Sequence, residues 1–323
     1  MKTSTSRAVL AALVFQCISI SYAQAWFFSS PNKSYADTQY PIVLVGGFFA
    51  FDSILGIEYF YGIGDDLRRY GAEVYETDVS EFQTNEFRGE ELLQEIEEYL
   101  AMTGHQKVNI IAHSQGSPTA RYVASVKPEI IASITSVHGM NRGTELADAI
   151  RYLVPEGSVR ESLLEKLANA VGYFWSTLSG GKNRDSQSAI AILKAANTES
   201  AASFNEIHPA GLPTAACGKS GAHEVEGVRY WSWGGTGGSF GKVTNPADLL
   251  DDLLFTITPL SFSDRYHDGV VPLCGQYLGK PIRHNYRHNH VDAMRHLFGL
   301  IGLTVNPRTL YRNHANRLKE AGL

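Results

Sequence analysis

The feature that most constrains this fold is an alternation of strand and helix patterns between residues 40 and 139. Segment 40–47 is a continuous apolar run that ends in glycines, as expected of a strand buried on both faces. Strand, helix, strand, helix and strand patterns follow at 72–79, 85–104, 107–112, 116–126 and 131–139. Strands joined through helices form parallel sheets with right-handed crossovers. The sequence therefore predicts an α/β fold with a mostly parallel sheet, and functional groups at the carboxyl ends of its strands.

Length and composition suit one large α/β domain or two modest ones, and no separate second domain is indicated along the chain. The chain has 323 residues, of which 44% are hydrophobic and 19% charged, and it contains no internal repeat. We expect one domain over residues 26–323. The formal net charge is −5, and no basic cluster is interleaved with aromatic residues. Nucleic acid is therefore not an expected partner.

The first 25 residues have the pattern of a secretory signal peptide. Lys2 and Arg7 flank the start of an apolar stretch, 8–20, that is too short to span a bilayer comfortably. Small residues then predict cleavage after Ala23 or Ala25. The mature protein is thus expected to be secreted.

Two cysteines remain after the signal segment, Cys217 and Cys274. An even number of cysteines in an exported chain predicts one disulfide, because the compartment outside the cytoplasm is oxidising. The alternative is a pair of buried free thiols. A metal site is less favoured, because neither cysteine belongs to a C-x-x-C pair.

Ser114 lies between the predicted strand 107–112 and the predicted helix 116–126. A serine at such a junction is either a helix N-cap or a nucleophile held on a sharp turn. The turn requires small residues two positions before and after the serine, and Ala112 and Gly116 meet that requirement. This pattern favours a nucleophile, which needs a neighbouring base to take its proton.

The base and its acid partner should follow in the order serine, aspartate, histidine. His290 lies at the end of a loop, before a helical pattern, and Asp268 precedes a glycine where a strand leaves the sheet. Residues 283–296 also contain H-x3-H and H-x-H spacings, but no ligand carboxylate falls in register for a zinc site. The backbone N–H groups of Gln115 and Phe48 are the candidate donors to an oxyanion.

A strongly amphipathic helix is predicted over 158–181, ended by two glycines. Its apolar face either packs on the core or covers the site as a lid that can turn towards lipid. The lid region would extend over about 141–190.

Several motifs together resemble the secreted triacylglycerol lipases of the Pseudomonas and Burkholderia type. They are "YPIVLVGGFFAFDSILGIEYFYGIGDDLRRYGAEVYETDVS", "RGEELLQEIE", "KVNIIAHSQGSPTARYVA", "HDGVVPLCGQ" and "NYRHNHVDAM…HANRLK". The resemblance extends over about residues 38–320. It implies an α/β-hydrolase fold with helices on both faces of the sheet and a mobile lid in the 158–180 helix. It also implies a triad of Ser114, Asp268 and His290, and a disulfide between Cys217 and Cys274.

The same resemblance implies a structural Ca²⁺ that holds the loop carrying His290. Asp292 matches one carboxylate ligand, and His296 and Leu300 match positions that supply backbone carbonyls. The second carboxylate of the family falls on Asn245, which can ligate through its amide oxygen with one negative charge fewer. Ca²⁺ binding is therefore expected to be weakened.

Three other positions depart from the family's pattern. Gly46-Gly47 replaces a His-Gly pair, Gln115 replaces a histidine, and Ala112 replaces a glycine. None removes a triad member or a backbone donor. Family members also commonly use a membrane-anchored lipase foldase as a partner.

The sequence thus predicts a secreted serine lipase, supported by Ca²⁺, that acts on acylglycerols at a lipid–water interface through an acyl-enzyme. Two alternatives stay open. One is an esterase for short, soluble esters, and the other is a secreted binding protein that has kept the hydrolase fold with little activity.

Overall fold

The structure is a computed structural model that describes residues 31–47, 53–54, 57–80, 83–155, 157–158, 189–238, 261–295, 299, 301 and 304–323. The predicted signal segment and nearly all of the predicted lid helix lie outside these residues. So do Phe48, Asn245, His296 and Leu300.

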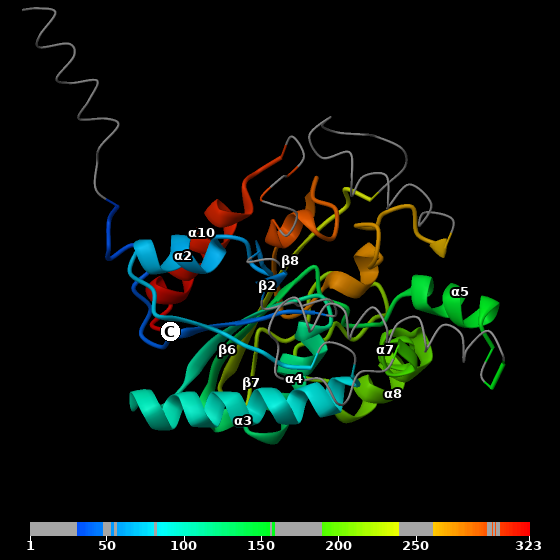
Figure 1. The fold of residues 1–323 in the computed structure, drawn as a ribbon, viewed down its shortest axis with the longest axis horizontal. Helices are drawn as coiled ribbons and strands as arrows, with labels where there is room; N and C mark the ends of the chain where they lie inside the picture. The colour runs from blue at the N-terminus through cyan, green and yellow to red at the C-terminus, as the bar shows by residue number, and fades with distance from the viewer. Residues whose placement is uncertain are drawn as a thin grey trace, which may run out of the picture.

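A single twisted sheet forms the centre of the molecule (Figure 1). Its strands are β1 (Ile42–Val45), β4 (Val74–Glu76), β5 (Val108–His113), β6 (Ile131–Val137), β7 (Glu224–Val225), β8 (Val228–Gly235) and β9 (Lys280–Tyr286). Their order is β4-β1-β5-β6-β8-β7, and β9 also pairs with β8. Every pairing in this sheet is parallel except that of β7 with β8. The predicted mostly parallel sheet is confirmed.

Helices cover both faces of this sheet (Figure 1). They are α2 (Ile63–Arg69), α3 (Asn85–Thr103), α4 (Gly116–Val126), α5 (Glu145–Leu153), α7 (Ala189–Ala196), α8 (Thr198–Ile207) and α10 (Pro307–Glu320). Short 3-10 turns lie at η1 (Pro128–Ile130), η4 (Leu273–Gln276) and η5 (Asp292–Met294), and a small separate hairpin joins β2 (Ser53–Ile54) to β3 (Ile57–Glu58).

Strand β1 shows why the sheet needs helices on both sides. Val43 and Val45 belong to one apolar cluster, shared with α3 and α4. Ile42 and Leu44 belong to a second cluster, shared with α2 and α10. Successive side chains of a strand point to opposite faces, so a continuous apolar run must be covered twice.

The ends of the elements follow local chemistry. The side chain of Thr84 accepts a hydrogen bond from the N–H of Phe87 and caps the start of α3, and Gly104, with φ of 78°, ends that helix. The strand expected over 131–139 ends instead at Val137. His138 has φ of 47°, a left-handed conformation that cannot continue a strand.

Helices α5, α7 and α8 lie together at one side of the sheet (Figure 1). A small apolar cluster fills the space between α5, α7 and the loop that carries Val270 and Val271. This loop follows Asp268, so the cluster helps to place a predicted site residue.

Candidate active site

Ser114 lies on a sharp turn between β5 and α4, where the sequence predicts a nucleophile. Its φ is 57°, which residues other than glycine, asparagine and aspartate rarely adopt. A side chain at Gly116 could not be accommodated, because its Cβ would lie 2.6 Å from the carbonyl oxygen of Val45. The small residue after the serine therefore allows the backbone of α4 to approach β1 closely.

The three residues of the predicted triad form one hydrogen-bonded row. The distance from Ser114 Oγ to His290 Nε2 is 2.8 Å, and that from His290 Nδ1 to Asp268 Oδ2 is also 2.8 Å. Ser114 and His290 are 176 positions apart in the chain. The fold thus brings together the alcohol, imidazole and carboxylate that the sequence selected.

The carboxylate of Asp268 is fully buried and accepts four hydrogen bonds. Oδ1 accepts from the backbone N–H groups of Val270, at 2.9 Å, and Val271, at 2.7 Å. Oδ2 accepts from Nδ1 of His290 and Nδ1 of His138. Burial by itself would raise the pKa of Asp268, but the adjacent imidazoles of His290 and His138 outweigh it and hold the pKa below its usual range. Asp268 is therefore ionised.

The ionised carboxylate fixes the tautomer of His290. Because Asp268 has no proton to donate, Nδ1 of His290 must be the donor in their hydrogen bond. In the neutral imidazole, Nε2 is then an acceptor, and it faces the hydroxyl of Ser114. This is the arrangement that a general base needs to take the serine proton.

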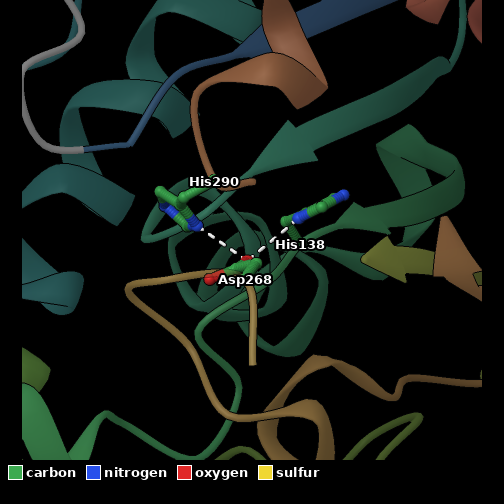
Figure 2. A group of neighbouring side chains, drawn as sticks. All are labelled: His138, Asp268 and His290. Atoms are coloured by element: carbon green, nitrogen blue, oxygen red, sulfur yellow. Dashed lines mark hydrogen bonds and ion pairs between the residues drawn. The ribbon is translucent and has the colours of Figure 1, made fainter. Parts of the chain in front are cut away.

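His138 is a site residue that the sequence analysis did not single out. Its Nδ1 lies 2.9 Å from Asp268 Oδ2, on the other side of the carboxylate from His290 (Figure 2). Its position directly after β6, the strand next to β5, is the signal that could have found it. The signal was hidden because the predicted strand was extended two residues too far.

His138, Asp268 and His290 are also close enough to hold a metal ion by spacing alone, since their ligand atoms all lie within 4.8 Å of one another. All three side chains are buried, and the hydrogen bonds of both imidazoles to one carboxylate oxygen account for the spacing. Nothing in this arrangement favours Ca²⁺, which takes mostly oxygen ligands.

The loop after β1 passes directly over Ser114. A Cβ at Gly47 would lie 2.6 Å from Ser114 Cβ and 3.0 Å from its Oγ, so only glycine fits there. Arg88, fully buried on α3, fixes this loop by donating to the carbonyl oxygen of Gly46 at 2.6 Å. Phe48, the next residue and a predicted oxyanion donor, lies outside the described residues.

Gln115, the other predicted oxyanion donor, directly follows Ser114 and is the N-cap residue of α4. Its side chain is 1% exposed and donates to the carbonyl of Gln83, at 2.8 Å, and to Oδ1 of Asn85, at 3.3 Å. These bonds hold the side chain of Gln115 against the start of α3 and the residues just before it. Its backbone N–H lies at the positive end of the α4 dipole, as an oxyanion donor requires.

A buried hydrogen-bond chain links this loop to the base. The N–H of Gly47 donates to the hydroxyl of Tyr59 at 3.0 Å, and that hydroxyl lies 2.7 Å from Nδ1 of His113. His113 Nε2 donates to the carbonyl oxygen of His290 at 3.0 Å. Burial holds the pKa of His113 well below its usual value, so the ring stays neutral and can accept from Tyr59.

Of the predicted Ca²⁺ ligands, only Asp292 is described by the structure. Its side chain is 3% exposed, and Oδ2 accepts a hydrogen bond from the N–H of Asn289 at 2.9 Å. A buried carboxylate in the loop that carries His290 has the donor chemistry that Ca²⁺ takes. The complete ligand set stays a prediction.

The disulfide is present between Cys217 and Cys274, which are 57 positions apart in the chain. Cys274 lies in η4, a few residues after Asp268. The buried side chain of Gln276, in the same turn, donates to the carbonyls of Gly235 and Val271, both at 3.1 Å. The loop that carries Asp268 is thus tied down on its far side as well.

Among the described residues, no helix is both long and apolar enough to cross a membrane.

Comparison with known proteins adds relatives over nearly the whole chain. A triacylglycerol lipase of Vibrio cholerae serotype O1 is 44% identical over 96% of this chain and 99% of its own length. Those of Pseudomonas fragi and Burkholderia plantarii are 40% and 35% identical, covering 89% and 90% of this chain and 98% and 88% of their own.

Solved structures with lower identity share the fold. The mature Bacillus licheniformis lipase BlEst2 has a TM-score of 0.55 at 14% identity, covering 90% of this chain and 94% of its own. The metagenomic carboxyl esterase MGS0156 has a TM-score of 0.57 at 15% identity, covering 87% and 76%. The family model described as alpha/beta hydrolase fold matches residues 40–222. The chain therefore belongs to the alpha/beta hydrolase fold family and, within it, to the family of these bacterial triacylglycerol lipases.

Proposed function

We propose that this protein is a triacylglycerol lipase that hydrolyses carboxylic ester bonds through an acyl-enzyme on Ser114. The observation that carries the proposal is the row of Ser114, His290 and Asp268, with both hydrogen bonds at 2.8 Å. The protein that contains this row is itself 44% identical to a triacylglycerol lipase over nearly its full length. Family membership supports the substrate class, and the geometry supports the reaction.

The proposed reaction starts when Nε2 of His290 takes the proton of Ser114 as Oγ attacks the acyl carbonyl carbon. Asp268 keeps Nδ1 of His290 protonated and stabilises the imidazolium that forms. Backbone N–H groups of Gln115 and Phe48 stabilise the negative oxygen of the tetrahedral intermediate. His290 then gives its proton to the leaving alkoxide, and the same steps with water as nucleophile release the fatty acid and restore Ser114.

The substrate is proposed to be a long-chain acylglycerol at a lipid–water interface rather than a short, soluble ester. Ser114 is 1% exposed, which supports a site that is covered until part of the protein moves aside. The amphipathic helix predicted over 158–180 is the proposed moving part. Shortening this helix should remove any rise in rate above the solubility limit of the substrate, whereas an esterase for soluble esters would show no such rise in either form.

Export through the periplasm is part of the proposal. The signal pattern in residues 1–25 and the Cys217–Cys274 disulfide, which persists in oxidising compartments, both support it. A membrane-anchored lipase foldase is proposed as a partner in folding, by analogy with the family that the sequence resembles.

We also propose a structural Ca²⁺ held by Asp292 together with Asn245 and the backbone carbonyls of His296 and Leu300. When bound, the ion would hold the loop that carries His290. Adding a chelator should lower the thermal midpoint of the wild type by several degrees, and Asp292→Asn should abolish that response. A midpoint that does not respond to chelator in the wild type would contradict the Ca²⁺ site and leave the hydrolytic proposal intact.

The test of the main proposal compares Ser114→Ala with Ser117→Ala on short- and long-chain triglycerides. Ser117 is a matched control, because it is a buried serine three positions along whose hydroxyl donates to Asn141. We expect Ser114→Ala to lose about 10⁴-fold or more in kcat, and Ser117→Ala to stay within a few-fold of the wild type. Equal rates for Ser114→Ala and the wild type would contradict the mechanism.

A phosphonate ester separates an enzyme from a binding protein that has lost its activity. An activated Ser114 should be labelled covalently and stoichiometrically, and the label should be absent from Ser114→Ala. A wild-type protein that binds triglyceride without being labelled would favour the binding protein.

A further inference from the structure

The carboxylate of Asp268 has two imidazole partners on a single oxygen. Oδ2 is 2.8 Å from Nδ1 of His290 and 2.9 Å from Nδ1 of His138. Figure 2 shows the two rings approaching Asp268 from opposite sides. His290 continues the row to Ser114, whereas no hydrogen bond among the described residues joins His138 to the serine, so His138 requires its own explanation.

Hydrogen bonds hold both the backbone and the ring of His138 in place. The residue has φ of 47° directly after β6, and its N–H donates to the carbonyl of Trp233 on the neighbouring strand β8 at 2.9 Å. The side chain is fully buried, and its Nε2 finds no hydrogen-bond partner among the described residues. Asp268 is therefore the only hydrogen-bonding partner that this part of the structure gives the ring.

We propose that His138 is a positioning residue that holds the catalytic acid Asp268 in the orientation that serves His290. This inference rests on the proposed function, because it assigns Asp268 its part in the triad.

Both oxygens of the Asp268 carboxylate are held by hydrogen bonds. Val270 and Val271 hold Oδ1 from one side, and His138 holds Oδ2 from the other. Four donors fill the acceptor positions of a carboxylate, so Asp268 cannot rotate without leaving a buried donor unpaired. Oδ2 thus stays aligned on Nδ1 of His290 throughout the reaction. His138 does this without touching Ser114, so it acts only through the acid.

The chain offers a well-matched set of variants at this position. Asn has a side-chain N–H group near the place of histidine Nδ1, and it tolerates the left-handed backbone that His138 adopts. Leu has nearly the same shape as Asn and no donor. Gly accepts the backbone conformation fully and also has no donor. His138→Asn, His138→Leu and His138→Gly therefore separate the hydrogen bond from shape and from backbone strain.

We expect His138→Leu and His138→Gly to lose about ten- to a hundredfold in kcat with KM within about twofold of the wild type. His138→Asn should recover most of the loss. The proton shared by His290 Nδ1 and Asp268 Oδ2 should give a low-field proton NMR signal that shifts or disappears in the Leu variant and returns in the Asn variant. If either His138→Leu or His138→Gly does not fold, the kcat of the other variant tests the proposal.

His314 provides the control for loss of a buried histidine. It is fully buried on α10, and its Nε2 lies 2.6 Å from the hydroxyl of Thr135 on β6, the strand that leads to His138. His314→Leu should lower the thermal midpoint yet leave kcat and the low-field signal unchanged.

Two results would overturn the proposal. One is a wild-type kcat in His138→Leu or His138→Gly, and the other is an equal loss in His138→Asn and His138→Leu. Ser114→Ala is assayed alongside to distinguish these results from a failure of the proposed function. Full activity of Ser114→Ala would contradict the proposed mechanism. Loss of activity in Ser114→Ala, together with full activity of the His138 variants, would contradict only the role of His138.

Discussion

Around Ser114, the space between neighbouring atoms restricts which residues can occupy several positions. The serine has a left-handed backbone, Gly116 lies against the backbone of β1, and Gly47 lies against the serine itself. These three positions let a strand, a helix and a loop meet at one hydroxyl. Small changes of volume here should therefore affect the reaction strongly.

Gly47→Ala tests that expectation. The added Cβ would lie 2.6 Å from Ser114 Cβ, so the loop after β1 must shift away and take the proposed oxyanion donor with it. We expect a loss of about 100-fold in kcat, since a displacement of about 1 Å at a reacting centre has that effect. Steady-state kinetics on a short-chain ester measures it.

Gly275→Ala is the control for Gly47→Ala. It adds the same methyl group at another buried glycine, where the nearest atom is the Val271 Cγ1 at 3.3 Å. Wild-type kcat in Gly47→Ala would contradict the close approach of the loop to the nucleophile.

The sequence was sufficient to place Ser114, Asp268 and His290 at the ends of predicted elements, in the order that the turn motif implies, and the structure brings the three together. It was insufficient for Arg88 and His138. A buried guanidinium that donates to Gly46 has no local pattern, since its partner lies 42 positions away. His138 needed the end of β6 to be placed within one residue, and periodicity does not place strand ends so closely.

Among the elements, the turn η4 and the loop before it depend on a covalent link. The Cys217–Cys274 disulfide closes a long loop that contains β8, and Cys274 belongs to η4. Closing a loop of this length stabilises the folded state by about 4 kcal/mol in the loop-entropy account. The link therefore matters to the whole molecule as well as to the loop that carries Asp268.

Replacing both cysteines, Cys217→Ser with Cys274→Ser, should lower the free energy of unfolding by about 2–4 kcal/mol. Urea titration followed by circular dichroism measures the change. A reductant should destabilise the wild type by a similar amount and have no effect on the double variant. Equal stability of the two proteins in oxidising buffer would show that the link contributes nothing.

Elements with continuous apolar runs were predictable, and β9 was not. Strands β5 and β6 are buried at every position, and the sequence places both. Strand β9 is mostly exposed and contains Arg283 and His284, so its pattern indicates a histidine-rich loop rather than a strand. An edge strand keeps polar side chains because only one side of it is paired.

At the scale of the whole molecule, several histidines in the described interior are held neutral by burial. Burial lowers the pKa of His113, His138 and His314, and it lowers the pKa of His284 and His288 to about 3. In the unfolded chain these rings titrate near 6.5. Below that pH the unfolded state binds protons that the folded state does not, and the folded state is destabilised.

The contribution of these histidines to the free energy of unfolding should thus be nearly constant from about pH 8 to 6.5 and fall steadily as the pH drops below 6.5. Each buried ring contributes up to about 1.4 kcal/mol per pH unit to the slope. Urea titrations at a series of pH values measure it. His284→Phe keeps an aromatic ring against Tyr277 and should give a shallower slope. An unchanged slope in that variant would contradict the assignment.

The 176 positions between Ser114 and His290 have a consequence for the life of the polypeptide before it is complete. The serine lies between β5 and α4, whereas the imidazole of His290 follows β9, the last strand among the described residues, which pairs with β8. Until His290 is in place, the hydroxyl of Ser114 lacks the base that faces it in the folded chain. The proposed nucleophile and its base therefore come together only when the tertiary structure is complete.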